Sequence, residues 1–233
     1  MANQKEIEAL IYEALNKQKQ GNQHSLWDCL VLVGLTSINQ GHYAAYLYKS
    51  ALETTAIESK QLLWRRYADA LSEMLIVVGL PKTLNALYSM MPMVEKSDLI
   101  NLKKSDWEAD TSARGWQYAT LTHHDLADRY KEIALYAPDV VTHITLNLSI
   151  EKLLSDYSMH DGLATMALLL TVLVTMNCSI QASWYADGYL RHGGEKESLR
   201  GVVEFAKKIA HDAGSELPAD FPSVENMLGG TPP

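Results

Sequence analysis

A long apolar segment, LATMALLLTVLVTMNC at residues 163–178, constrains the fold of this chain more than any other feature. It spans about 16 residues, whereas a helix that crosses a bilayer needs about 20. We therefore expect a buried core helix and no membrane span. Such a helix must be surrounded by a sizeable core, and a chain of 233 residues that are 47% hydrophobic is long enough to form one.

The rest of the chain also favours helices, because alternating apolar patterns flanked by turn dipeptides are almost absent. Prolines and glycines fall between segments whose apolar residues recur at helical spacing. The sequence therefore predicts an all-α protein. We expect helices at residues 3–20, 26–40, 41–54, 59–78, 82–91, 125–136, 139–154, 162–177, 179–191 and 198–213.

An internal repeat suggests that one domain is built from two similar halves. LVGLTSINQ at residues 32–40 aligns with LTVLVTMNC at residues 170–178, and each segment precedes an aromatic helix. Identity is low, so coincidence of two helical patterns is the alternative. We expect a single domain at residues 1–215, followed by a flexible Pro/Gly-rich tail at residues 216–233. Within the domain, the expected parts are repeat one (about 24–91), a polar connector (92–116) and repeat two (about 117–215).

Composition excludes several classes of partner and cofactor. The formal net charge is -8 and the basic residues are scattered, so no basic groove for nucleic acid is expected. The N-terminal segment resembles neither a signal peptide nor a mitochondrial presequence, and we expect a cytoplasmic protein. Cys29 and Cys178 are expected to be free thiols. Metal-binding, Walker A, dinucleotide-binding and G-x-S-x-G motifs are absent from the sequence, so we expect no metal and no cofactor.

Several segments in order resemble the AhpD-like superfamily, which includes alkyl hydroperoxidase D and carboxymuconolactone decarboxylase. Residues 70–87, ALSEMLIVVGLPKTLNAL, are similar to the family's E…Y-x-G-x-P-x-x-x-N-A segment. Arg114-Gly115 and Ala137-Pro138-Asp139 are similar to its RG…PD spacer, and residues 177–193 fit its cysteine helix. The resemblance covers about residues 26–213 and implies an all-α, two-repeat AhpD-like domain that forms homo-oligomers.

The redox residues of that family are replaced here. Its redox members carry C-x-x-C followed by His, with a Glu a few turns earlier. Cys178 stands at the first thiol position, Gln181 at the second and Tyr185 at the His position, while Met166 falls near the Glu position. Disulfide chemistry needs an attacking and a resolving thiol, so peroxidase activity through this motif is not expected.

Gln181, Trp184 and Tyr185 share one face of the expected helix at residues 179–191 and are candidates for a site. Tyr185 would act as acid or base and Gln181 would orient the substrate, with Cys178, Trp184 and Tyr189 as contacts. The alternative is that this face is core, since aromatic stripes usually are, and that Cys178 is a buried filler.

Histidines and a second aromatic helix supply the remaining candidates. His160 is a candidate catalytic acid, although His160-Asp161 would also fit a cap of the apolar helix. From repeat one, Tyr43, Tyr46 and Arg65 are candidate substrate contacts, and surface pairing is the alternative for Arg65.

Three functions remain open from the sequence. The first is a cofactor-independent proton-transfer enzyme, an isomerase, lyase or cyclase, for example one that closes a ring by adding a hydroxyl to a double bond. Its small-molecule substrate would be apolar or aromatic. The second is a non-catalytic ligand-binding or oligomeric protein, and the third is a thiol-dependent peroxide reductase that uses Cys178.

Overall fold

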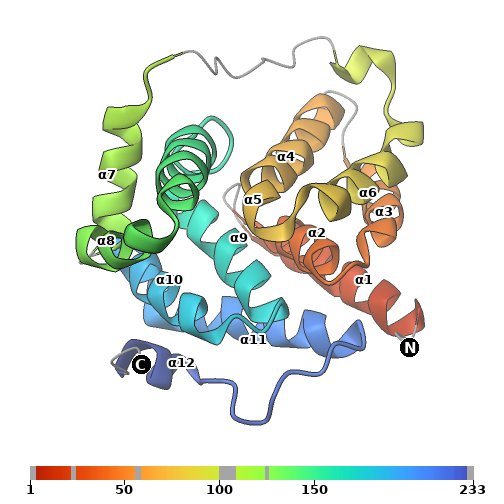
Figure 1. Cartoon of the computed structure of the whole chain (residues 1–233). Helices are drawn as coiled ribbons and strands as arrows, with labels where there is room; N and C mark the ends of the chain where they lie inside the picture. The colour runs from red at the N-terminus through yellow and green to blue at the C-terminus, as the bar shows by residue number, and fades with distance from the viewer. Residues whose placement is uncertain (1–3, 22–24, 56–58, 100–108, 124–125, 230–233) are drawn as a thin grey trace.

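The computed structural model describes residues 4–21, 25–55, 59–99, 109–123 and 126–229, and all regular structure in these ranges is helical (Figure 1). The all-α prediction is therefore confirmed. The N-terminal half contains α1 (Gln4–Gln20), α2 (Trp27–Ser37), η1 (Gly41–Tyr43), α3 (Ala44–Leu52), α4 (Lys60–Glu73), α5 (Leu75–Val78), α6 (Leu80–Met90), η3 (Met91–Met93) and η4 (Lys96–Leu99). The C-terminal half contains α7 (Ser112–Thr122), α8 (Leu126–Tyr136), η5 (Val140–Leu154), α9 (Gly162–Thr175), α10 (Ser179–Arg191), α11 (Lys196–Asp212) and α12 (Val224–Gly229).

The expected helices lie within a few residues of their predicted bounds, but the one at 41–54 divides into η1 and α3 and the one at 59–78 into α4 and α5. Three further features were not expected. Helix α7 begins at Ser112, inside the segment assigned to the connector, of which residues 100–108 lie outside the described ranges. Helix α12 lies within the segment assigned to the tail, and its Val224 and Met227 are buried. The helix at Val140–Leu154 is wound as a π-helix, which is rare at this length.

Helix α9 forms the centre of the molecule, as its apolar sequence requires. Almost all of its residues are buried, and it packs against α2, α10 and α11. A helix that is apolar on every side is stable only when other helices surround it. Two of its buried threonines satisfy their hydroxyls within the helix: Thr171 Oγ1 donates to the carbonyl of Ala167 at 2.9 Å, and Thr175 Oγ1 to that of Thr171 at 2.8 Å.

Helices α2 and α9 meet at their C-terminal ends. Ser37 and Thr175, the last residues of the two helices, share a buried hydrogen bond of 2.6 Å between their hydroxyl oxygens. Asn39 and Asn177 follow with positive φ values of 65° and 58°, a conformation that asparagine tolerates better than most residues. In both turns the backbone N–H of the asparagine donates a hydrogen bond to the backbone carbonyl three residues earlier. The backbone N–H of the next residue donates to the carbonyl five residues before it. The two helices therefore end in the same way.

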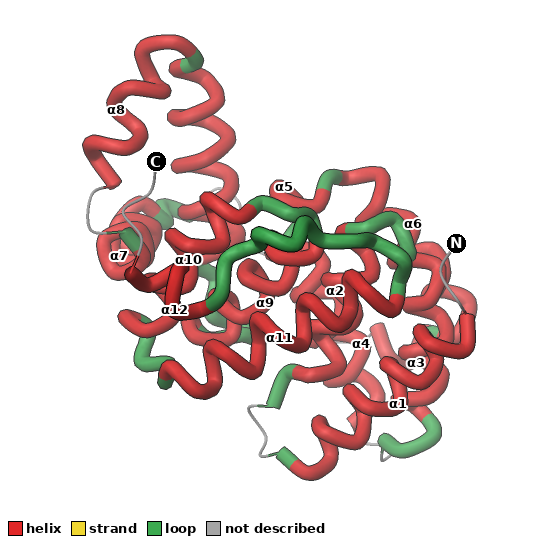
Figure 2. Tube along the Cα trace, turned by 90° about the horizontal axis from the view of Figure 1, so that it is seen from below, coloured by secondary structure: helices red, strands yellow, loops and turns green. Residues whose placement is uncertain are grey.

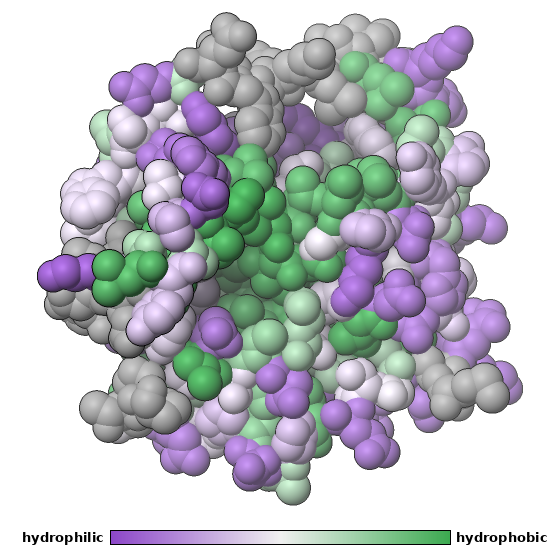
Figure 3. All heavy atoms as spheres, viewed as in Figure 1, coloured by the Kyte–Doolittle hydropathy of each residue, from purple (hydrophilic) through white to green (hydrophobic). Residues whose placement is uncertain are grey.

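Apolar side chains gather in the middle of the face shown in Figure 3, and polar side chains surround them. In Figure 2, α8 and η5 project from the body as a hairpin. At the turn of this hairpin, Leu135 is 79% exposed and Tyr136 is 84% exposed. Within the described residues, no helix is both long enough and apolar enough to span a membrane.

Close packing of α2 on α9 and α11 depends on Gly34. A Cβ atom at this position would lie 3.0 Å from Ile209 Cγ2 and 3.3 Å from Thr171 Cγ2. We expect Gly34→Leu to lower the free energy of unfolding by about 1–3 kcal/mol through overpacking. Gly201→Ala is the matched control, because its Cβ would meet only Trp27 at 3.8 Å, and we expect a gain of about 0.5–1 kcal/mol. Urea unfolding of both variants checks this, and a Gly34→Leu variant as stable as the parent would contradict the packing.

Candidate functional site

A buried hydrogen bond joins the two halves of the chain between α4 and the turn before α9. His160 Nδ1 lies 2.8 Å from Glu73 Oε1, across 87 residues of sequence. The other carboxylate oxygen, Glu73 Oε2, accepts a hydrogen bond from Thr165 Oγ1 at 3.2 Å. His160 is 2% exposed and Glu73 is 6% exposed, so water contributes little to solvating either group. Both oxygens of the carboxylate are therefore held by protein groups.

Local structure explains how His160 is positioned. Asp161 is the N-cap of α9, and its carboxylate accepts the backbone N–H of Ala164 at 2.9 Å. This confirms the predicted cap and fixes the backbone immediately after His160. Thr165, in the first turn of α9, then reaches the same carboxylate as the imidazole. The start of the apolar helix therefore supplies two of the groups that meet Glu73.

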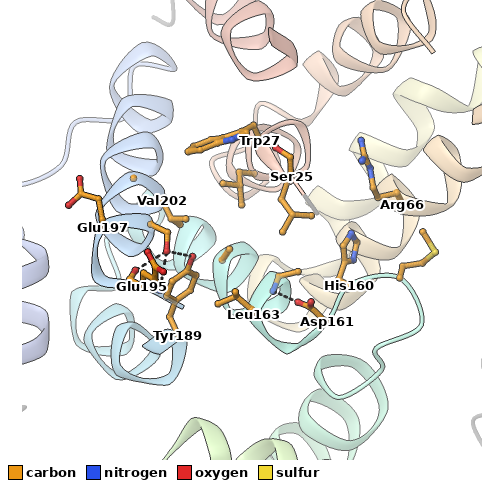
Figure 4. A pocket seen from close by; sticks show the side chains of 17 residues that line it. Ser25, Trp27, Arg66, His160, Asp161, Leu163, Tyr189, Glu195, Glu197 and Val202 are labelled. Carbon is orange, nitrogen blue, oxygen red and sulfur yellow. Dashed lines mark hydrogen bonds between the residues drawn. The ribbon is translucent and has the colours of Figure 1, made fainter. Parts of the chain in front are cut away.

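His160 lines a cavity of about 550 Å³ between α2, α4, α9, α10 and α11 (Figure 4). This volume lies in the usual range for small-molecule sites. Leucines, alanines and Trp27 form much of its wall. Tyr189 lies toward the end of the cavity that is far from His160, and its hydroxyl donates to Ser198 Oγ at 3.2 Å. Arg66, His160 and Asp161 line one end, whereas Glu195 and Glu197 line the other. The cavity is thus largely apolar with polar groups grouped at its ends.

Arg66 is held at the cavity wall by a buried carboxylate. Its Nη2 pairs with Asp28 Oδ2, which also accepts the Tyr67 hydroxyl at 3.0 Å. The other Asp28 oxygen accepts the backbone N–H of Cys29 at 2.8 Å. Asp28 is only 1% exposed, so its charge is balanced inside the protein rather than by solvent. The guanidinium is therefore fixed in place before any ligand binds.

Two polar nitrogens at this end of the cavity have no hydrogen-bond partner among the described residues. They are Nε2 of His160 and Nε of Arg66, and both atoms are buried. An unsatisfied buried polar atom costs about 1–3 kcal/mol. Such groups are often satisfied by a ligand at a functional site. Both side chains line this end of the cavity, so a ligand bound there would lie beside them.

The contact with Glu73 decides which nitrogen of a neutral His160 carries the proton. An ionised carboxylate only accepts hydrogen bonds, so Nδ1 must donate and Nε2 keeps its lone pair. A histidine oriented in this way is a general base at Nε2, and after protonation it is a general acid. Proton transfer is therefore the chemistry that this arrangement supports.

The structure brings together only two of the residues predicted for the site, His160 and Tyr189, on the wall of the cavity. Tyr185 points elsewhere: its ring centre lies 5.2 Å from that of His123 at the end of α7, and burial raises the pKa of its hydroxyl. Tyr46 packs against Tyr12 of α1 with ring centres 6.1 Å apart. The others lie outside this cavity: Gln181 is exposed, and Cys178, Trp184, Tyr43 and Arg65 are half-buried.

The sequence predicted no role for Asp28 or Thr165. It indicated an arginine on the helix at residues 59–78 as a carboxylate ligand, and Arg65 was the one predicted as a substrate contact, while Glu73 was identified only within the AhpD-like segment. One signal was available for Asp28, which is the one charged residue in the apolar segment LWDCLVLVGLTS. An acid within a buried helix requires a partner. The sequence does not say which of the distant basic residues that partner is.

Neither cysteine belongs to this site. Cys29 is fully buried, and burial raises the pKa of its thiol well above the usual value, which opposes thiolate formation. Cys178 begins α10 and makes only a weak contact of 3.7 Å from its sulfur to the carbonyl oxygen of Met176. Among the described residues, no three His, Cys, Asp or Glu side chains are grouped to hold a metal ion.

Burial of the Glu73 carboxyl raises its pKa above the usual 4.5, although the hydrogen bond from His160 opposes the shift. A raised pKa in the folded state gives stability that is present below the unfolded-state pKa and is lost as pH rises through the folded-state pKa. We therefore expect the parent protein to lose stability relative to Glu73→Gln as pH rises from about 4 to 7. Urea unfolding across this range measures the difference, and a constant gap between the two proteins would contradict the shift. Asp69, whose pKa burial also raises, is present in both proteins, and its charge adds to the raised pKa of Glu73.

Comparisons with protein-family models, with curated proteins and with solved structures find no match to this chain. The chemistry of the site follows from its own geometry. That geometry has three parts: a cavity, a histidine oriented by a buried carboxylate, and a guanidinium fixed by a second buried carboxylate.

Proposed function

We propose that this protein is a cofactor-independent proton-transfer enzyme, an isomerase, lyase or cyclase that acts on a small apolar or aromatic metabolite. The observation that carries the proposal is His160 at the wall of the cavity, with Nδ1 bound to Glu73 and Nε2 free of any partner among the described residues. One nitrogen of this buried histidine is hydrogen-bonded to a carboxylate and the other has no partner among the described residues. This difference fits a general base better than a structural residue. The cavity wall suits a flat apolar substrate.

In the proposed step, His160 Nε2 removes a proton from a carbon next to a carbonyl group. The C–H bond breaks, its electron pair forms the C=C bond of an enolate, and an N–H bond forms at Nε2. The carbonyl π pair moves to oxygen, and the imidazolium then returns the proton to another carbon of the delocalised anion. In ring closure, a substrate hydroxyl instead gives its proton to Nε2 while its oxygen adds to a C=C bond conjugated with the carbonyl, and the imidazolium protonates the carbon of the resulting enolate. Glu73 stabilises the imidazolium through Nδ1 and keeps the ring in one orientation. No electrons are gained or lost, so neither an oxidant nor a cofactor is required.

We also propose that the chain is a divergent AhpD-like protein with two pseudo-repeated halves. Ser37 and Thr175, which share a hydrogen bond, are 138 positions apart. The same offset aligns residues 32–40 with residues 170–178, where both helices end in an asparagine of positive φ. Contact between equivalent residues is expected at a pseudo-twofold axis, since only there does a position meet its own counterpart.

A non-catalytic ligand-binding protein would also need the cavity, but it would not need an oriented histidine beside it. A thiol-dependent reductase is less well supported, because neither Cys29 nor Cys178 lines the cavity. The three functions predict different results in measurements of deuterium exchange, ligand binding and peroxide turnover.

Deuterium exchange in D₂O tests the proposal directly. The protein would be incubated with a panel of small aromatic and aliphatic ketones, and loss of the proton next to the carbonyl would be followed by NMR. We expect catalysed exchange for at least one flat apolar ketone, unchanged in Cys178→Ser and in Tyr185→Phe. Binding of these ketones with no exchange above the buffer rate would favour the ligand-binding alternative, and thiol-dependent peroxide turnover that Cys178→Ser abolishes would favour the reductase.

A further inference from the structure

Arg66 is a positively charged residue on the cavity wall that has no part in the proton transfer by His160. It lies seven residues before Glu73 on α4. Residues at this spacing share a helix face and have α-carbons about 10 Å apart along the axis. His160 is hydrogen-bonded to Glu73 and lines the same end of the cavity as Arg66 (Figure 4). A small molecule at this end would therefore lie between the two side chains.

Removing a proton next to a carbonyl places a negative charge on the carbonyl oxygen. That oxyanion forms at a distance from the proton-accepting atom, so a second group is needed to stabilise it. Arg66 has the required properties: a permanent charge, a side chain that lines the cavity and is 22% exposed, and a geometry already fixed by Asp28. Of the other charged groups near His160, Asp69, Glu73 and Asp161 are carboxyls, which would repel an oxyanion, and Arg65 does not line the cavity.

We propose that Arg66 is an oxyanion-binding catalytic residue, and that the substrate is an enolisable carbonyl compound whose oxygen meets the guanidinium while His160 removes the proton. This role rests on the proton-transfer function proposed above. Asp28 holds the guanidinium and, being enclosed, does not contact the substrate. Tyr189, Leu163 and Ala167 contact the apolar body of the substrate.

A phenolate tests the oxyanion site without turnover, since it is a stable flat oxyanion of similar shape to an enolate. The affinity of 4-nitrophenolate, at a pH where it is fully ionised, would be compared with that of neutral nitrobenzene. We expect the phenolate to bind at least about tenfold more tightly, as expected for one charge-assisted hydrogen bond. Arg66→Gln should reduce this ratio to about one, and Arg65→Gln, the adjacent arginine outside the cavity, should leave it unchanged.

Arg66→Gln leaves the buried Asp28 carboxylate without its partner, so this variant is unfolded in one possible outcome. The double variant Asp28→Asn/Arg66→Gln removes both charges together and serves as the second test, with folding checked by circular dichroism. A folded double variant that keeps the phenolate preference would overturn the proposal, as would a parent protein that binds the phenolate and nitrobenzene equally.

His160→Gln separates this inference from the proposed function. It should abolish deuterium exchange and leave the phenolate preference intact. Arg66-dependent phenolate binding without any exchange would support the oxyanion site and reject the base. Exchange that survives Arg66→Gln unchanged would support the base and reject the oxyanion site.

Discussion

Replacing His160 with glutamine is expected to lower the rate of substrate deuterium exchange by about 10²–10⁴-fold, the usual contribution of a general base. Glutamine fills similar space and its amide can still donate to Glu73, so the fold should be retained. What it lacks is a nitrogen that can accept a proton. The measurement is the initial exchange rate at saturating ketone, so that any change in substrate affinity does not enter.

Glu73→Gln is the companion variant. The carboxylate no longer forces the proton onto Nδ1 and no longer stabilises the imidazolium, so the rate should also fall. Because Gln can hold the ring in place, the fall should be smaller than in His160→Gln. Asp69→Asn, one turn earlier on α4 and outside the cavity, is the control and should retain most of the activity. Equal activity of the parent and His160→Gln would reject the proposed base.

Asp28→Asn is expected to destabilise the fold far more than removal of a surface charge. It leaves the guanidinium of Arg66, which is 22% exposed, without its counter-charge in a mostly buried site. Breaking a buried pair from one side costs about 3–5 kcal/mol, and the partial exposure of Arg66 places the effect near the lower value. For a chain of this size that corresponds to a fall in Tm of about 6–12 °C.

Glu13→Gln provides the matched control for Asp28→Asn. Glu13 pairs with Lys17 at 2.8 Å on the surface of α1, where both side chains are more than one-third exposed. Exposed pairs contribute about 0–1 kcal/mol, so the Tm should hardly change. Similar Tm values for Asp28→Asn and Glu13→Gln would show that the buried network does not stabilise the fold.

The helices were predictable because each is specified locally. Apolar spacing and Gly or Pro punctuation give the bounds of α2, α6 and α9 without knowledge of any tertiary contact. Helix α7 was not predicted because polar residues dominate its start, and it becomes helical where it packs against η5. Its helicity therefore depends on a tertiary partner that the local pattern does not reveal.

The candidate site was only partly predictable, because it depends on contacts between distant residues and on helix rotation. His160 was selected from its position before the apolar helix, but its partner Glu73 is 87 residues away. Successive residues on a helix point about 100° apart, so the sequence could place an arginine on α4 without distinguishing Arg65 from Arg66. Tyr185 and Tyr189 lie one turn apart on nearly the same face of α10. Tyr185 nevertheless packs against His123 and Tyr189 lines the cavity, so position along the helix decides as well as rotation.

The ¹⁵N chemical shifts of the His160 ring test the central claim most directly. The protein would be labelled with ¹⁵N-histidine, the signals assigned with His160→Gln, and the spectra recorded where the ring is neutral. If Glu73 orients His160 as a base, the proton resides on Nδ1 and Nε2 is bare; in Glu73→Gln the two tautomers become mixed. A proton on Nε2 in the parent protein would contradict the account, because that nitrogen would then have no lone pair with which to accept a substrate proton.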